Sequence, residues 1–333
     1  MKNIQYIIKT YGLDPKTQCL KKINRGISSE NYILGVRRPE FFLKEYRPGK
    51  WDEVPDIHRI MRILQKHVPI PQPLKNKKGA SYGKNKKEVY ALFPFINARH
   101  ISRNKLGATA IRSMAHHQAK IHQVPTKIIP RLPVVNQRWD DAEFLEKAYT
   151  ILAMLEKMKR TTTFDRMARR GLRKKIELVE KNTVAFKDLG LHMNFICHGD
   201  YQASNMFFTK DDKVQWIFDW EKVGKGSRAF EVLQTMEYDF FDGVFSRKNK
   251  KDAFLFLHEY TKVFPLGFEE LRTALRARLI RHAHSLWIEK DFYLENNPRG
   301  KKFLAEQYRT INFYENNLET FALELKKVLV HKR

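Results

Sequence analysis

Residues 198–205 read HGDYQASN, and residues 217–221, at the end of an apolar run, read IFDWE. The first stretch has the pattern His-x-Asp-x4-Asn, in which Asp200 and Asn205 are the polar residues of interest. Asp219 follows 14 residues after Asn205. Taken singly, they have ordinary structural explanations: a carboxylate in a turn, an amide in a loop and a cap at a strand end. Their order, with a short strand–turn–strand between them, favours one shared functional site.

These residue types match the few parts that phosphoryl transfer requires. A carboxylate accepts or orients the hydroxyl proton of the acceptor, oxygen ligands hold Mg²⁺ against the phosphates, and a lysine with backbone amides holds the nucleotide. Asparagine suits a metal beside phosphates, because its carbonyl oxygen binds the cation without adding negative charge. The sequence therefore predicts Asp200 as the catalytic residue, and Asn205 and Asp219 as metal ligands.

The chain has 333 residues, 42% hydrophobic and 12% aromatic, which is enough for two domains or two lobes with real cores. Its net charge is +26, from 63 Lys and Arg against 37 Asp and Glu. Such an excess attracts anions, including nucleotides, nucleic acids and acidic membranes. The basic residues are spread along the chain and are not interleaved with aromatic side chains, as in a nucleic-acid platform. We favour a generally basic surface, with a nucleic-acid-associated protein as an open alternative.

The cysteines and the apolar segments bear on the compartment. Cys19 and Cys197 are the two cysteines, and they indicate neither a disulfide framework nor a metal-binding spacing. The opening residues have no long apolar core, and no stretch approaches the roughly 18 apolar residues of a membrane span, so we expect no signal peptide and no membrane partner. A cytoplasmic protein is the expectation.

Hydrophobic periodicity divides the chain into an N-terminal lobe, residues 1–96, and a C-terminal lobe, residues 97–333. In the first we expect a short helix, a five-stranded sheet and one inserted helix, in chain order at residues 4–12, 19–25, 30–37, 40–46, 53–67, 73–75 and 88–95. In the second we expect helices around a strand-rich stretch at 194–219, at residues 104–122, 139–158, 164–187, 227–242, 250–263, 267–294 and 299–328. The predicted class is α+β, with the motifs at the junction of two lobes.

With these motifs the chain resembles, over nearly its whole length, the superfamily of aminoglycoside phosphotransferases, choline kinases and type II homoserine kinases. Its catalytic-loop motif, His-Gly-Asp-x4-Asn, is similar to residues 198–205, and its metal-binding motif, Ile-Asp-Trp/Phe-Glu, is similar to residues 218–221. The resemblance implies a protein-kinase-like two-lobed fold, with a small antiparallel sheet and one helix before a larger helical lobe. It also implies ATP, or another nucleoside triphosphate, and Mg²⁺ as cofactors.

The resemblance points to nucleotide-binding residues upstream. The turn RGISSENY is similar to the family's phosphate-covering turn and places Gly26 and Ser28 nearest the phosphates. Lys44 in FFLKEY matches the family's phosphate-binding lysine, and Glu53 matches the helix glutamate that pairs with it. Taken alone, these residues would be a hairpin turn, a solvent-facing edge lysine and a glutamate at a helix start.

Several other polar residues have weaker claims. Glu30 competes with Glu53 for the pairing with Lys44. Glu231 stands where the family has an aspartate with a structural role, and His122 matches a helix-end position that we expect to be structural. A small acidic group is favoured as a solvated helix end over a site for a cationic acceptor, and it comprises Glu237, Asp239 and Asp242.

The resemblance does not name the molecule that receives the phosphoryl group. The front half of the chain leans toward homoserine kinases and the Asp-Trp-Glu motif toward choline kinases, and amino alcohols, sugars and aminoglycosides stay open. The fold does not decide, because the acceptor pocket is built from the variable helical part. The predicted function is ATP-dependent phosphorylation of a hydroxyl on a small molecule. The alternative from a different class is a catalytically inactive kinase-like protein of the spore-coat type.

Overall fold

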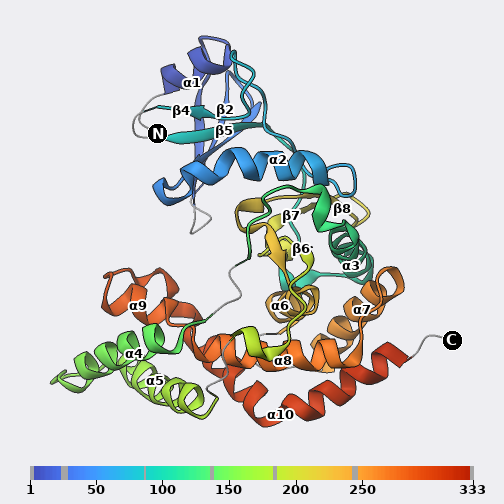
Figure 1. Ribbon diagram of the computed structural model, residues 1–333. Helices are drawn as coiled ribbons and strands as arrows, with labels where there is room; N and C mark the ends of the chain where they lie inside the picture. Colours follow the sequence, from blue (N-terminus) through green and yellow to red (C-terminus); the bar gives the residue numbers. More distant parts are fainter. Residues whose placement is uncertain are drawn as a thin grey trace.

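The computed structural model describes residues 4–23, 29–85, 88–135, 139–182, 186–241 and 247–330. The N-terminal elements are α1 (Ile4–Tyr11), β1 (Gln18–Ile23), β2 (Ser29–Gly35), β3 (Phe41–Tyr46), the 3₁₀ turn η1 (Pro48–Glu53), α2 (Val54–Leu64), β4 (Gly83–Lys84) and β5 (Val89–Pro94). The five strands form one antiparallel sheet in the order β1-β2-β3-β5-β4. Figure 1 shows this sheet beside α2 at one end of the molecule. The predicted sheet with one inserted helix is confirmed.

The alternation of side chains along the strands gives the sheet two different faces. On β5, Tyr90 and Leu92 face the small core that includes Ile7 of α1, whereas Ala91 and Phe93 face the core that includes α2. The predicted stripe of α2 is buried against that second face, and it comprises Ile57, Ile60, Met61 and Leu64. On β3, Leu43 faces the α1 side. Its neighbour Lys44 therefore points to the α2 side, from which it reaches the C-terminal lobe.

The fourth strand differs from the prediction. Residues 73–75 are extended but outside the sheet, and β4 at Gly83–Lys84 takes the edge position instead. Proline has no backbone N–H to donate to a ladder, and this segment begins with Pro73, two residues after Pro71. It keeps one sheet-like bond, from the N–H of Leu74 to the carbonyl of Leu92 at 2.7 Å.

The C-terminal lobe is mainly helical, with two short β-ladders, β6–β9 and β7–β8. Its helices are α3 (Ala108–Gln123), α4 (Asp141–Glu156), α5 (Thr163–Lys181), α6 (Arg228–Phe240), α7 (Arg247–Val263), α8 (Phe268–Ala283), α9 (Trp287–Tyr293) and α10 (Leu304–Val330). Its strands are β6 (Phe195–Cys197), β7 (Met206–Phe208), β8 (Val214–Ile217) and β9 (Gly224–Gly226). Its 3₁₀ turns are η2 (Arg103–Lys105), η3 (Thr126–Ile128), η4 (Phe186–Leu189), η5 (Ala203–Asn205), η6 (Trp220–Lys222) and η7 (Pro298–Phe303).

The helix predicted over 267–294 is two helices, α8 and α9. α8 ends at Ala283 and α9 begins at Trp287, and between them the carbonyl of Ser285 accepts a hydrogen bond at 2.6 Å from the buried ammonium of Lys175. That carbonyl is then bonded to a side chain of α5 rather than to the next helical turn. A buried tertiary contact, which periodicity does not reveal, accompanies the break.

One large core runs from α2 and the sheet through the short strands to α6, α7, α8 and α10. A second core joins α4, α5 and α9, which Figure 1 shows projecting to one side of the helical lobe. Figure 1 also shows α6 in the middle of this lobe, next to β6. None of the helices in the described part of the chain has the length and hydrophobicity of a membrane span. The boundary at residues 96 and 97 stays a prediction.

Candidate active site

Two short turns carry the polar residues of the predicted site. The first leaves β6 and contains Gly199, whose φ of +83° is a left-handed conformation that favours glycine. The second follows β8 and contains Asp219, whose φ is +62°. A Cβ at position 199 would lie 2.3 Å from the carbonyl oxygen of Lys222, so the two turns touch through their backbones. Gly199 is therefore required both by its backbone dihedral and by the close approach of the second turn.

Lys44 joins the N-terminal sheet to the second turn. Its Nζ lies 2.8 Å from Asp219 Oδ1 and 2.5 Å from Glu221 Oε1, and its side chain is only 11% exposed. Burial opposes the charge of the lysine, but the two carboxylates outweigh it, so the pKa of Lys44 lies above its ordinary value. Burial also opposes the charge of Asp219, and Lys44 outweighs it, so the pKa of Asp219 lies below its ordinary value. The fold thus joins two predicted site residues that are 175 positions apart.

Glu53 does not pair with Lys44, and this part of the prediction is corrected. Glu53 ends η1, its side chain is half exposed, and its carboxylate lies 2.6 Å from Lys50 Nζ. Glu221 takes the place that the resemblance gave to Glu53. Glu221 follows Asp219 by two residues, in η6. It is buried there beside Lys44.

The structure gives less information about the other residues considered for nucleotide binding. Gly26 and Ser28 lie outside the described residues. Glu30, the competing partner for Lys44, is on β2 and bonds instead to Lys22 at 3.0 Å and to the hydroxyl of Tyr32.

The corrected pairing predicts different outcomes for two glutamates. Glu221→Ala removes a buried carboxylate from Lys44 and is expected to lower the free energy of unfolding by about 1–3 kcal/mol. Glu53→Ala removes an exposed ion pair, so the expected loss is below about 1 kcal/mol. Urea denaturation of the two variants measures both values. A larger loss for Glu53→Ala than for Glu221→Ala would contradict the pairing.

Asp200 and Asn205 lie together, as predicted from their spacing. The Nδ2 of Asn205 donates to the backbone carbonyl of Asp200 at 2.9 Å. The carboxylate of Asp200 accepts at 2.8 Å from Gln202 Nε2 and at 2.9 Å from Lys222 Nζ, and its side chain is 17% exposed. Asp200 therefore combines a fixed position with access from solvent, which a proton acceptor for a bound hydroxyl needs. Their roles in catalysis and metal binding are taken up as proposals below.

Helix α6 holds the 198–205 loop in place through polar side chains spaced four residues apart, so that they lie on one face. The contacts are Glu231 with the N–H groups of His198 and Gly199, Thr235 Oγ1 with the carbonyl of Tyr201 at 3.0 Å, and Asp239 with the N–H of Ala203 at 3.0 and 3.1 Å. This set was not predicted from the sequence, although its spacing is visible there as Glu-x3-Thr-x3-Asp.

Glu231 is the centre of this arrangement. It is fully buried, and its Oε2 also lies 2.8 Å from Nε2 of His122. The other ring nitrogen of His122 lies 2.7 Å from the hydroxyl of Tyr260. Cys197 Sγ lies within 4.8 Å of the potential metal-ligand atoms of His122 and Glu231. The direct bond between His122 and Glu231, however, already pairs the groups that a metal would need. The glutamate that replaces the family's usual aspartate thus keeps a structural role, and His122 is structural as expected.

The small acidic group is not a solvated helix end, and this prediction is corrected. Glu237 is buried and bonds to Arg278, His282 and Tyr314. Burial opposes its charge, but Arg278 outweighs it and lowers the pKa of Glu237 to about 2. Asp239 is buried against the 198–205 loop, and Asp242 lies outside the described residues. The periodicity of α6 places Glu237 and Asp239 on inward faces, where a sequence count of acidic residues cannot locate them.

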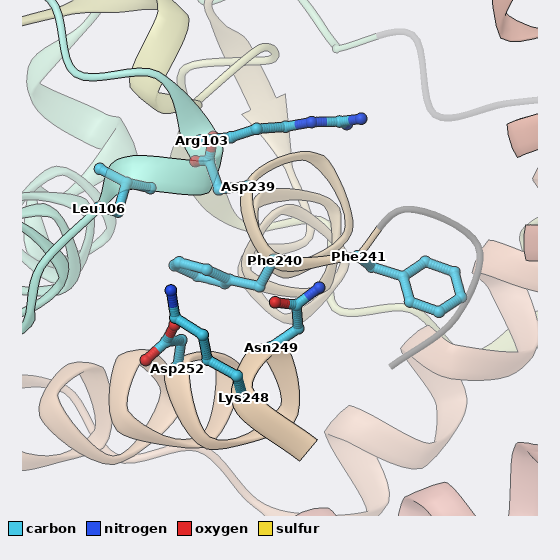
Figure 2. Close-up of a pocket in the computed structure, with 8 residues that line it drawn as sticks. All are labelled: Arg103, Leu106, Asp239, Phe240, Phe241, Lys248, Asn249 and Asp252. Atoms are coloured by element: carbon cyan, nitrogen blue, oxygen red, sulfur yellow. The ribbon is translucent and has the colours of Figure 1, made fainter. Parts of the chain in front are cut away.

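A small pocket lies on the far side of Asp239, between η2, α6 and α7, and Figure 2 shows Asp239 beside Arg103 at its edge. Its lining residues are Arg103, Leu106, Asp239, Phe240, Phe241, Lys248, Asn249 and Asp252. Burial raises the pKa of Asp239 to about 7, with the N–H of Ala203 and the charge of Arg103 offsetting part of the effect. Asp239 therefore changes its charge near neutral pH, at the contact that holds the 198–205 loop.

This shift predicts a pH dependence of stability. Because the folded state raises the pKa of Asp239 from 3.8 to about 7, the charged form costs free energy, and stability is lost as the pH rises from about 4 to about 7. The loss is up to about 4 kcal/mol, at 1.36 kcal/mol per unit. Asp239→Asn carries no such charge, so its stability should exceed that of the wild type increasingly over this range. Urea denaturation between pH 4 and 8 tests this, and two parallel stability curves would contradict it.

The model of the phosphotransferase enzyme family matches residues 20–264. The solved structure of a spectinomycin phosphotransferase with ADP and spectinomycin has a TM-score of 0.64 at 17% identity, covering 97% of each chain. An aminoglycoside phosphotransferase from Alicyclobacillus acidocaldarius has a TM-score of 0.59 at 13% identity, covering 98% of this chain and 96% of that chain. A GDP complex of an aminoglycoside 2′-phosphotransferase has a TM-score of 0.60 at 11% identity, covering 94% of this chain and 100% of that chain.

No curated protein is a significant sequence match to this chain. The structural likenesses, at such low identities, concern the fold alone, and they confirm the predicted two-lobed kinase-like architecture. The family model spans most of the chain, including Lys44, the 198–205 loop and Asp219. The chain belongs to the phosphotransferase enzyme family.

Proposed function

We propose that this protein is a small-molecule kinase, which transfers the terminal phosphoryl group of ATP to a hydroxyl group. The observation that carries the proposal is the pairing of Lys44 with Asp219 across the two lobes, next to the accessible carboxylate of Asp200. In this assignment Lys44 binds the nucleotide phosphates.

The donors of Asn205 and Asp219 fit Mg²⁺, which binds in kinases through one or two carboxylates and neutral oxygens. The bond from Asn205 Nδ2 to the carbonyl of Asp200 orients the side-chain amide of Asn205. The Oδ1 of this amide therefore points away from that carbonyl. Asp219 offers a carboxylate from the second turn, held there by its own left-handed backbone. When bound, the metal supplies positive charge that neutralises the phosphate oxygens.

The mechanism that these residues support is a direct, in-line transfer. The acceptor oxygen forms a bond to the terminal phosphorus while the bond from that phosphorus to the leaving oxygen of ADP breaks. The proton of the acceptor hydroxyl passes to the carboxylate of Asp200. The acceptor hydroxyl is itself the nucleophile, so no covalent enzyme intermediate is formed.

The charges around the site favour a neutral or anionic hydroxyl compound over a polycationic aminoglycoside. In the described part of the chain, five carboxylates of α6 and of the turn after β8 are each paired with an internal cation or a backbone N–H, namely Asp219, Glu221, Glu231, Glu237 and Asp239. A polycation would need free carboxylates, and the net charge of +26 repels it. This inference separates the chain from the antibiotic kinases that share its fold.

Nucleotide binding gives the first test. Mg²⁺ with ATP is expected to raise the melting temperature, because a ligand that binds only the folded state stabilises it by mass action. Asp219→Asn, which removes a proposed metal ligand, should abolish most of the shift. The absence of any shift in the wild-type protein would favour the alternative of an inactive kinase-like protein.

The acceptor is then sought by measuring ATP consumption with panels of hydroxyl compounds. The panels are amino alcohols with homoserine and choline, neutral sugars, hydroxy acids with sugar phosphates, and aminoglycosides. We expect turnover in one of the first three panels. Turnover confined to aminoglycosides would overturn the inference about charge while supporting the kinase assignment.

A further inference from the structure

Lys222 is the cationic residue of the two touching turns, and the proposed mechanism leaves it without a task. Its Nζ lies 2.9 Å from Oδ2 of Asp200, the proposed proton acceptor. Its side chain is 55% exposed, in contrast to the buried Lys44 on the other side of Asp219. The side chain of Asp200 is 17% exposed, so the pair is partly buried and its lysine end faces solvent.

The backbone of Lys222 is closely packed, although its side chain is 55% exposed. Its carbonyl oxygen and Cβ would lie 2.3 and 2.6 Å from a Cβ at position 199, so its main chain is packed against Gly199 of the 198–205 loop. Lys222 ends η6, the same 3₁₀ turn that carries Glu221 and follows Asp219. The lysine is therefore anchored between the proposed proton acceptor and the proposed metal ligand, with a flexible chain of four carbons that can follow a moving group.

The reaction creates a charge problem at this place. A phosphoryl group in transit carries negative charge on its equatorial oxygens, and it must approach the acceptor oxygen beside the carboxylate of Asp200. Two unit charges of the same sign about 4 Å apart repel each other by about 4 kcal/mol at the effective dielectric constant of a protein surface. Lys44 lies beside Asp219 and Glu221, where it is proposed to bind the nucleotide phosphates. Lys222 is the described cation that is bonded to Asp200 itself.

We propose that Lys222 is a further catalytic residue, whose ammonium group moves from Asp200 onto the oxygens of the phosphoryl group during transfer. An ammonium has three N–H donors, so it can keep one on Asp200 while it directs another to the phosphoryl oxygens. Lys222 stays protonated throughout: the acceptor proton goes to Asp200, and the electron pair of the breaking bond leaves with ADP. The ion pair with Asp200 is the resting position of this cation. The inference rests on the proposed function.

Binding of a transition-state mimic tests the inference without knowledge of the acceptor. Transition-state analogues bind at least about 10²-fold more tightly than ground-state ligands, and aluminium fluoride with Mg²⁺ and ADP imitates the phosphoryl group in transit. We expect aluminium fluoride to tighten ADP binding to the wild-type protein. In Lys222→Met most of this gain should be lost, by about 10²-fold, while the affinity for Mg²⁺ and ADP alone stays the same. Lys222→Arg should keep part of the gain, because it keeps the charge.

Two further variants separate this role from a positioning role. Asp200→Asn should keep the gain from aluminium fluoride, because it leaves the lysine charge in place. Lys213→Met, an exposed lysine paired with Asp211, should behave as the wild type. If Lys222→Met kept the gain, Lys222 would act only through Asp200 or not at all, and the inference would be overturned with the kinase assignment intact. If the wild-type protein bound no Mg²⁺ and ADP, the proposed function itself would fail.

Discussion

Asp200→Asn is expected to lower kcat for phosphoryl transfer by about 10²–10⁴-fold, the range that a positioned general base commonly supplies. The amide keeps the size of the side chain and can still accept from Gln202, but it cannot take the proton of the acceptor hydroxyl. Asp200 is not a proposed metal ligand, so the affinity for Mg²⁺ and ATP should be unchanged. Steady-state kinetics with the acceptor found by the screen, together with nucleotide titration, measure both quantities.

The matched control is Asp211→Asn, an exposed aspartate in the turn between β7 and β8. It should leave kcat and nucleotide affinity at wild-type values. Asp219→Asn should show the opposite pattern to Asp200→Asn. It removes a proposed metal ligand, so the affinity for Mg²⁺ and ATP should fall. If Asp200→Asn turned over within about 10-fold of the wild type, Asp200 would not be the proton acceptor.

Glu231→Leu is expected to cost about 3–5 kcal/mol of folding free energy, the cost of breaking a buried, charged hydrogen-bond network by removing one partner. The leucine fills similar space but accepts no hydrogen bond. It leaves the N–H groups of His198 and Gly199, and Nε2 of His122, without their acceptor in a fully buried place. Urea denaturation measures the loss. Because the 198–205 loop then loses an anchor, kcat should fall even under conditions where the variant stays folded.

Two variants sharpen this prediction. Glu231→Gln keeps one carbonyl oxygen for the loop and should recover a large part of the loss. Glu146→Leu, at an exposed position of α4, should change the stability by less than about 0.5 kcal/mol. A loss for Glu231→Leu no larger than that of Glu146→Leu would show that α6 does not hold the loop.

Much of the fold can be predicted from local patterns in the sequence. The stripe of Ile57, Ile60, Met61 and Leu64 forms the buried face of α2, because apolar residues with a 3.6-residue period lie on one side of a helix. The fourth strand was misplaced, because an extended segment with alternate prolines looks like a strand but cannot complete a ladder. The break between α8 and α9 was missed, because it accompanies a contact with Lys175 from a distant helix.

The candidate site divides in the same way. The sequence by itself determined the family and nominated Asp200, Asn205, Asp219 and Lys44, because short motifs of fixed spacing and the family resemblance record which groups the chemistry needs. Only the tertiary structure decided their partners. In the structure Glu221, and not Glu53, pairs with Lys44. Glu237 and Asp239 of α6 are buried, and Lys222 pairs with Asp200. Ion pairs depend on distances of a few ångströms between segments far apart in the chain, and linear spacing carries no information about such distances.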